Sequence, residues 1–151
     1  MTKSQYIQEL KKIEHILKSK STNSITWNES EYWFHVESNK SHENYIWIQY
    51  EFDEIRVGVG PVYEYFSDKY EGREYIKGLK RFIQLLTNPL NMIFHYRGDF
   101  NYRTEYYLNG KNKDELIGIS IKWLYPFWKK KTIKSQIQNP IISEAELNYV
   151  P

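Results

Sequence analysis

Two segments of the chain carry apolar side chains spaced four, three and four residues apart, the period of one face of an α-helix. These positions are Tyr6, Leu10, Ile13 and Leu17 in the first segment and Tyr75, Leu79, Phe82 and Leu86 in the second. A capping box at residues 2–5 predicts the start of the first helix. We expect the second helix to start within residues 67–72, and Pro89 predicts its end, because a proline disfavours helix at the residue before it. We therefore predict two amphipathic helices.

The pattern elsewhere changes to an alternation of period two, which is typical of β-strands. The predicted strands are residues 32–36, 45–52, 55–59, 92–97, 103–108 and 117–125, with residues 62–66 as either a further short strand or an irregular edge. Runs of strands that no helix interrupts favour antiparallel pairing, since parallel neighbours need a crossover connection. The sequence therefore predicts an α+β fold with an antiparallel sheet of about six strands and both helices on one face.

The chain also contains a near repeat. Residues 6–17 match residues 75–86 at several positions, and each copy is followed by a strand with a Phe-His pair. We expect one α+β domain over residues 1–151, and we hypothesise an α-β-β-β duplication with pseudo-repeats at 1–66 and 67–134. The remaining tail, residues 135–151, is sparsely patterned, which predicts a segment that drapes over the sheet or orders on a partner.

Composition narrows the classes of function. The absence of cysteine excludes disulfides, thiolate zinc sites and cysteine nucleophiles. No apolar run reaches the length of a membrane span, and the first fifteen residues lack the apolar core of a secretory signal, so we expect a cytoplasmic protein. Charge is unevenly placed, with 7 basic and 10 acidic residues in 1–66 but 14 and 9 in 67–151. Such asymmetry is typical of an interaction surface.

No catalytic, metal or cofactor motif is visible, which argues against an enzyme and predicts no cofactor. The four histidines lack the close spacing of a local metal pair. His35 and His95 hold matching positions in the two halves, and with Arg97 and Arg103 they form a hypothetical anion or ligand site. Cross-strand pairing of the two arginines with Glu105 explains the same residues without a ligand.

The segment from Trp123 to Lys131 combines aromatic and basic residues. Trp128 beside Lys129, Lys130 and Lys131 suits stacking on bases and neutralising phosphates, anchoring at a membrane interface, or a protein hot spot. The alternative interpretation is structural: Trp123 and Tyr125 then continue the buried face of a strand, and the lysines are its solvated exit. A second candidate patch lies on the predicted strands, on a sheet face that no helix covers. Its residues are Trp33, Tyr45, Trp47 and Tyr107.

We hypothesise a non-enzymatic protein-interaction module that neutralises or chaperones a partner protein. The build is similar to that of many bacterial immunity and antitoxin proteins, a similarity of architecture alone. The alternatives are single-stranded nucleic-acid binding through residues 123–131, and a small-ligand or enzymatic site between the two halves. Pairing of the chain with itself as a homodimer also satisfies an uncovered aromatic face.

Overall fold

A computed structural model describes residues 2–20, 24–28, 30, 32–38, 41–69, 71, 74–109 and 114–148. The chain divides into two compact units. Unit 1 comprises residues 1–87 and 140–151, and unit 2 comprises residues 88–139. In the parts of the chain that the structure describes, no helix is both long and apolar enough to cross a bilayer.

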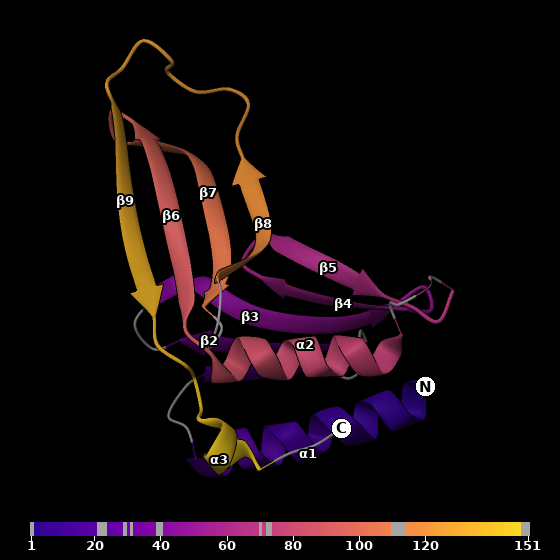
Figure 1. Cartoon of the computed structure of the whole chain (residues 1–151). Helices are drawn as coiled ribbons and strands as arrows, with labels where there is room; N and C mark the ends of the chain where they lie inside the picture. Colours follow the sequence, from indigo (N-terminus) through magenta and orange to yellow (C-terminus); the bar gives the residue numbers. More distant parts are fainter. Residues whose placement is uncertain are drawn as a thin grey trace. The chain divides into compact units, whose positions relative to one another are not determined.

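Unit 1 is built on a five-stranded antiparallel sheet in the order β1-β2-β3-β4-β5, so that every strand pairs with its neighbour in sequence (Figure 1). The strands are β1 (Ser24–Asn28), β2 (Trp33–Ser38), β3 (Ser41–Glu51), β4 (Glu54–Val59) and β5 (Val62–Phe66). The helices are α1 (Lys3–Lys20), α2 (Tyr75–Thr87) and the short α3 (Glu144–Leu147). The last of these returns the C-terminal segment to α1, which it contacts.

The core of unit 1 lies between the helices and one face of the sheet. Both predicted helical stripes are buried, and the alternate residues Ile46, Ile48 and Tyr50 of β3 face them. Aromatic contacts join the layers: Phe82 of α2 meets Phe34 edge-to-face at 5.8 Å, and Tyr6 of α1 lies 5.4 Å from Tyr50. Each such buried side chain contributes about 1.5–3 kcal/mol by leaving water. The two 4-3-4 stripes are thus stabilised as helices by burial against this face of the sheet.

The opposite face of the unit 1 sheet is shaped by Gly58. This glycine pairs with Trp47 across β3 and β4 and with Tyr63 across β4 and β5. The indole of Trp47 lies over the space that a side chain at position 58 would fill, and its Nε1 donates a 2.9 Å hydrogen bond to the carbonyl of Gly60. A glycine is required here by close approach, not by an unusual backbone angle.

Unit 2 is a four-stranded antiparallel sheet in the order β8-β7-β6-β9 (Figure 1). Its strands are β6 (Leu90–Arg97), β7 (Phe100–Asn109), β8 (Asp114–Ile121) and β9 (Lys131–Gln138). The two edge strands, β8 and β9, are consecutive in the chain. The segment between them, residues 122–130, therefore crosses one end of the sheet from edge to edge (Figure 1).

The α+β class with antiparallel strands is confirmed, but the prediction of one sheet with about six strands is wrong. The strands form two sheets of five and four, and a third helix lies in the predicted tail. Alternation identifies a strand and its two faces, but it does not identify the partner strand. Strands β1 and β9 were not predicted, because their apolar residues are few. The duplication stays a prediction, and residues 149–151 of the predicted tail lie outside the described residues.

Two predicted boundaries also moved, for local reasons. The helix expected to start within residues 67–72 begins at Tyr75, whose backbone N–H is 3.4 Å from the Asp68 carboxylate. The strand predicted over residues 117–125 ends at Ile121, the last residue paired with β7. Pro126 follows shortly after, and it has no N–H to continue a ladder.

We predict that Gly58→Ala lowers the free energy of unfolding by about 1–3 kcal/mol, the usual cost of overpacking. The added methyl carbon would lie 2.5 Å from the Val62 carbonyl oxygen and 2.6 Å from the Trp47 ring. Urea denaturation followed by tryptophan fluorescence measures the change. Ile76→Ala, on the exposed side of α2, is the control with little expected effect. A Gly58→Ala midpoint equal to that of the wild type contradicts this packing.

Candidate functional site

Among the residues that the structure describes, the most exposed group of large apolar side chains lies in the connection between β8 and β9. We call residues 122–131, Lys122 to Lys131, the aromatic–lysine tip. Four of its side chains, Trp123, Leu124, Phe127 and Trp128, are between 68% and 81% exposed. Bulky apolar groups scattered singly over a surface need no explanation, but four within six residues form a patch of the kind that marks an interaction site.

The tip is fixed to the sheet rather than hanging from it. The Tyr125 ring stacks on Tyr102 of β7, with centroids 4.4 Å apart and planes 22° from parallel. The backbone N–H of Lys122 donates a 2.8 Å hydrogen bond to the Tyr102 carbonyl, and the N–H of Gly98 donates a 2.9 Å bond to the Lys130 carbonyl. These contacts hold both ends and the middle of the tip, so its apolar side chains are presented to solvent by a defined backbone.

The conformation of Gly98 makes its hydrogen bond to the Lys130 carbonyl possible. Gly98 lies in the β6–β7 turn with a φ of +61°, a backbone conformation that favours glycine. A methyl group there would lie 2.7 Å from Cδ of Lys129. Beside it, Nη1 of Arg97 donates a 3.2 Å hydrogen bond to the Lys129 carbonyl. The turn and the tip therefore form one packed end of the sheet.

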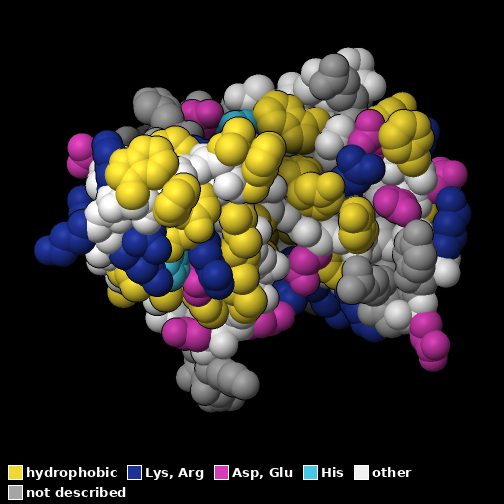
Figure 2. Space-filling model, turned by 90° about the horizontal axis from the view of Figure 1, so that it is seen from above, with side chains coloured by type: hydrophobic (Ala, Val, Ile, Leu, Met, Phe, Trp, Pro, Cys, Tyr) yellow, Lys and Arg dark blue, Asp and Glu magenta, His cyan; other side chains and the backbone are white. Residues whose placement is uncertain are grey.

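Basic residues surround the exposed apolar groups. Unit 2 contains nine basic and four acidic residues, which leaves a net charge of +5. Lys122 and residues 129–131 belong to the tip itself, and the Lys122 ammonium lies 5.3 Å from the centre of the Phe100 ring. On the face drawn in Figure 2, hydrophobic side chains adjoin Lys and Arg side chains in the same way. An apolar partner surface that carries negative charge complements this end of the sheet.

The apolar surface continues from the tip along one face of the sheet, which we call the open face. The register places Ile121 beside Arg103 in β8 and β7, and Ile133 beside His95 in β9 and β6. The exposed apolar residues of this face lie on the two edge strands. They are Leu116, Ile119 and Ile121 in β8 and Ile133 and Ile137 in β9, with 37% to 61% of each side chain exposed. The buried side chains of unit 2 lie on the opposite face, among them Met92, Tyr106 and Leu108.

The centre of the open face is a polar cluster around Glu105. Its Oε1 lies 2.9 Å from Nε2 of His95 and 2.9 Å from Nη2 of Arg103. The Tyr107 hydroxyl donates a 2.7 Å hydrogen bond to Oε2. The bond from Tyr107 lowers the pKa of the Glu105 carboxyl, and the charges of Arg103 and His95 lower it further. The same bond raises the pKa of Tyr107.

Only two of the four residues of the predicted anion site belong to the Glu105 cluster. His95 and Arg103 do lie together, but both face the Glu105 carboxylate, which lies two residues from Arg103 on the same strand rather than across from both arginines. Arg97 binds the Lys129 carbonyl. His35 belongs to unit 1, where burial lowers its pKa against the opposing effect of Glu37. The structure therefore does not gather the four into one cationic site within either unit.

The predicted aromatic patch is likewise divided. Trp33, Tyr45 and Trp47 share one face of the unit 1 sheet and are half-buried, and His35 links Trp33 to Tyr45 with ring distances of 4.9 Å and 4.5 Å. Tyr107 belongs to the sheet of unit 2 and is engaged by Glu105.

The patch predicted within residues 123–131 is different, because the tip presents its residues together. Trp128, Lys129, Lys130 and Lys131 are all exposed, and Trp123 is exposed rather than part of a buried strand face. The sequence analysis did not include Leu124 and Phe127 in this patch. Their position between the two tryptophans could have identified them. The isoleucines of β9, which stand four residues apart, were also missed.

Two further observations bear on function. Among the residues the structure covers, no three His, Asp or Glu side chains are grouped so that they could hold a metal ion. Comparison with known proteins finds no matching family model, curated protein or solved structure.

We predict that Glu105→Gln destabilises the fold at neutral pH and that the loss shrinks as the pH falls. A carboxyl whose folded pKa is lowered stabilises the fold above its unfolded pKa, about 4.3 for glutamate, and this contribution disappears as the pH drops through the folded pKa. Urea unfolding from neutral to acidic pH measures the difference from the wild type.

Glu71→Gln, at an exposed position, is the control for this experiment. Its curve should run parallel to that of the wild type. A Glu105→Gln deficit of constant size at every pH would show that the carboxylate charge does not hold the cluster.

Proposed function

We propose that the chain is a non-enzymatic protein-interaction module that binds a partner protein through the aromatic–lysine tip and the adjoining open face. The observation that carries this proposal is the exposure of Trp123, Leu124, Phe127 and Trp128 on a loop that is fixed by stacking and hydrogen bonds. Because these side chains are exposed in the free chain, the free energy of removing them from water can stabilise a complex instead of the fold.

The energetics favour this use of the tip. Burying one large apolar side chain contributes about 1.5–3 kcal/mol, and tryptophan is enriched among the few residues that dominate binding energies. Association also costs free energy when loops must be ordered. The Tyr102–Tyr125 stack and the Gly98–Lys130 hydrogen bond reduce that cost, since the backbone is already in place.

A protein fits these features better than a membrane or a nucleic acid. A lipid surface takes up the projecting tip but leaves the ordered polar cluster of Glu105 unused. Stacking on bases requires aromatic rings, whereas Leu124 and the isoleucines of β8 and β9 are aliphatic. A folded partner can cover the apolar edges and also hydrogen-bond with the polar centre. The lysines favour a partner with acidic groups around its apolar surface, and they speed encounter with it.

The role of neutralising or chaperoning that partner rests on the similarity of build to immunity and antitoxin proteins. Single-stranded nucleic-acid binding is the second candidate, and the observation that favours it is the run Trp128 to Lys131, an exposed ring followed by three exposed lysines. It predicts an affinity that falls steeply with salt.

A site-specific photo-crosslinker tests the proposal. We place it at position 124 in the tip and, as the matched control, at the exposed position 76 of α2, and irradiate cells of the native host. The proposal predicts a discrete protein adduct from position 124 only. Adducts that nuclease removes, adducts to lipid, the same adducts from both positions, or none from position 124 would each contradict it.

With that partner in hand, we predict that Trp128→Ala weakens binding about 30-fold, the equivalent of a hot-spot loss of about 2 kcal/mol. Replacing Lys129, Lys130 and Lys131 with glutamine should mainly slow association and reduce its dependence on salt. Surface plasmon resonance measures both, with Ile76→Ala as the control. An unchanged affinity for Trp128→Ala would place the contact elsewhere.

A further inference from the structure

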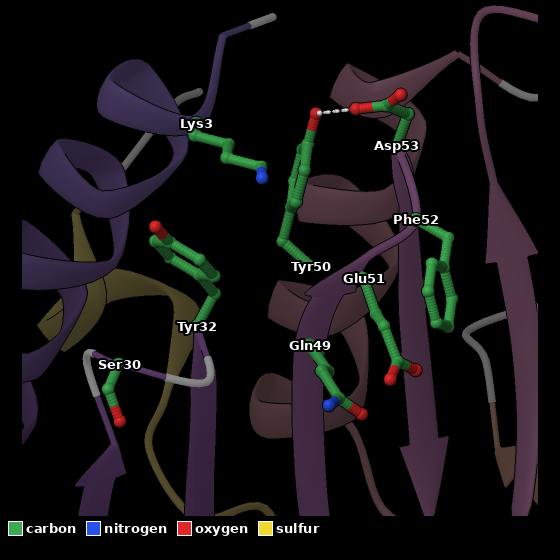
Figure 3. A pocket seen from close by; sticks show the side chains of 8 residues that line it. All are labelled: Lys3, Ser30, Tyr32, Gln49, Tyr50, Glu51, Phe52 and Asp53. Carbon is green, nitrogen blue, oxygen red and sulfur yellow. Dashed lines mark hydrogen bonds between the residues drawn. The ribbon is translucent and has the colours of Figure 1, made fainter.

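A hollow in unit 1 lies beside the β3–β4 turn, on a different part of the chain from the tip (Figure 3). Its volume is about 610 Å³, within the range of about 300–1,000 Å³ that small-molecule sites occupy. Eight residues line it: Lys3, Ser30, Tyr32, Gln49, Tyr50, Glu51, Phe52 and Asp53. Aromatic rings and carboxylates thus make up most of its wall, together with a single lysine.

That lysine shows which chemistry the hollow accepts. The Lys3 side chain points toward the rings of Tyr32 and Tyr50, and its Nζ lies 5.3 Å and 5.7 Å from their centres (Figure 3). Both distances are within the about 6 Å at which a cation is attracted by the negative face of a ring. The two rings meet nearly edge-to-face at 6.4 Å. Together they form a corner in which one ammonium contacts both.

The electrostatics beyond the rings also favour positive charge. The carboxylates of Glu51 and Asp53 line the hollow, and Asp53 Oδ1 is 3.5 Å from the Tyr50 hydroxyl. Burial, followed by the interactions with Tyr75 and Asp53, raises the pKa of Tyr50 to about 12. The Tyr50 hydroxyl therefore stays neutral at physiological pH. Arg56 binds the Glu51 carboxylate at 2.7 Å and compensates its charge, so Asp53 is the lining carboxylate that favours a cation here.

Backbone strain is concentrated in the same wall. Tyr32, Phe52 and Asp53 have φ values of 52°, 50° and 59°, in the left-handed region that bulky residues avoid. Phe52 and Asp53 are the two central residues of the hairpin turn, where Asn-Gly is the usual choice. The Phe52 ring is 79% exposed at the rim, so its burial does not offset this strain. Strain of this kind clusters at ligand sites.

The surrounding contacts hold the strained residues in place. The Tyr50 N–H donates a 3.0 Å hydrogen bond to the Tyr32 carbonyl, and the Tyr75 hydroxyl donates a 2.6 Å bond to the Asp53 carbonyl. The Tyr32–Tyr50 corner and the exposed Phe52 are therefore kept in position by the body of unit 1.

We propose that this hollow binds an organic cation of the quaternary-ammonium class, and that the Lys3 ammonium occupies the position of the ligand's charge when no ligand is bound. A quaternary ammonium has no N–H and suits a corner of rings better than a hydrated lysine ammonium. Lys3 is the first residue of α1, and its flexible stem allows the side chain to leave as the ligand enters.

The test compares choline with its uncharged carbon isostere, dimethylbutanol, by NMR titration of the intact chain. Lys3→Met keeps the aliphatic stem and removes the competing charge. We expect Lys3→Met to bind choline about fivefold to tenfold more tightly than the wild type, a gain of the size of one cation–π contact, and not to bind the isostere. Adding Tyr32→Leu to Lys3→Met should abolish binding.

Two results would overturn the proposal. One is the absence of saturable choline binding to Lys3→Met. The other is equal binding of choline and the isostere, which would make the hollow a general apolar cavity. The NMR spectrum of each variant reports whether it is folded, and Lys3→Met changes no buried group. Because the tip belongs to unit 2, either outcome leaves the proposed protein interaction untouched.

Discussion

The stacking of Tyr125 on Tyr102 is the contact on which the proposed binding surface depends. The chain must pass from β8 to β9 across an entire sheet end, and nothing in the alternation of the strands directs that passage. The stack, at 4.4 Å, fixes the middle of the connection, and hydrogen bonds from Lys122 and Gly98 fix its ends. With the backbone held this way, Trp123 and Trp128 remain in solvent instead of packing against each other or the sheet.

The charge of the chain follows its division into units. Unit 2 has a net charge of +5 and unit 1, with twelve basic and fifteen acidic residues, a net charge of −3. Within the open face of unit 2, Glu105 pairs with Arg103 and lies 2.9 Å from His95. Four of the unit's other eight basic residues lie in the tip. In unit 1 the corresponding feature is the tyrosine-lined hollow, whose rings and Asp53 carboxylate favour a cation at the proposed site. The two candidate surfaces therefore select partners of opposite charge.

The spacing of apolar residues identified the helices and strands that have one buried side and one side in water. Tyr6 to Leu17 and Tyr75 to Leu86 face a sheet on one side and water on the other, so their stripes predicted both helices. Strand β9 is exposed on both faces along almost its whole length, so no alternation marked it. Trp123 and Tyr125 keep the spacing of a strand, but the ladder between β7 and β8 ends at the Arg103–Ile121 pair, and only the structure shows where the two side chains go. The hollow depends on left-handed backbone at Phe52 and Asp53, which the sequence does not encode in any local pattern.

The proposed interaction requires a tip that is ordered before any partner arrives, and amide hydrogen exchange of the free chain measures this order. The amides of Lys122 and Gly98 donate the hydrogen bonds that fix the tip, whereas the exposed Asp99 provides an internal reference. We expect slow exchange at Lys122 and Gly98 in the wild type and rapid exchange at Lys122 in Tyr125→Leu. Exchange at Lys122 and Gly98 as fast as at Asp99 in the wild type would contradict the proposed interaction.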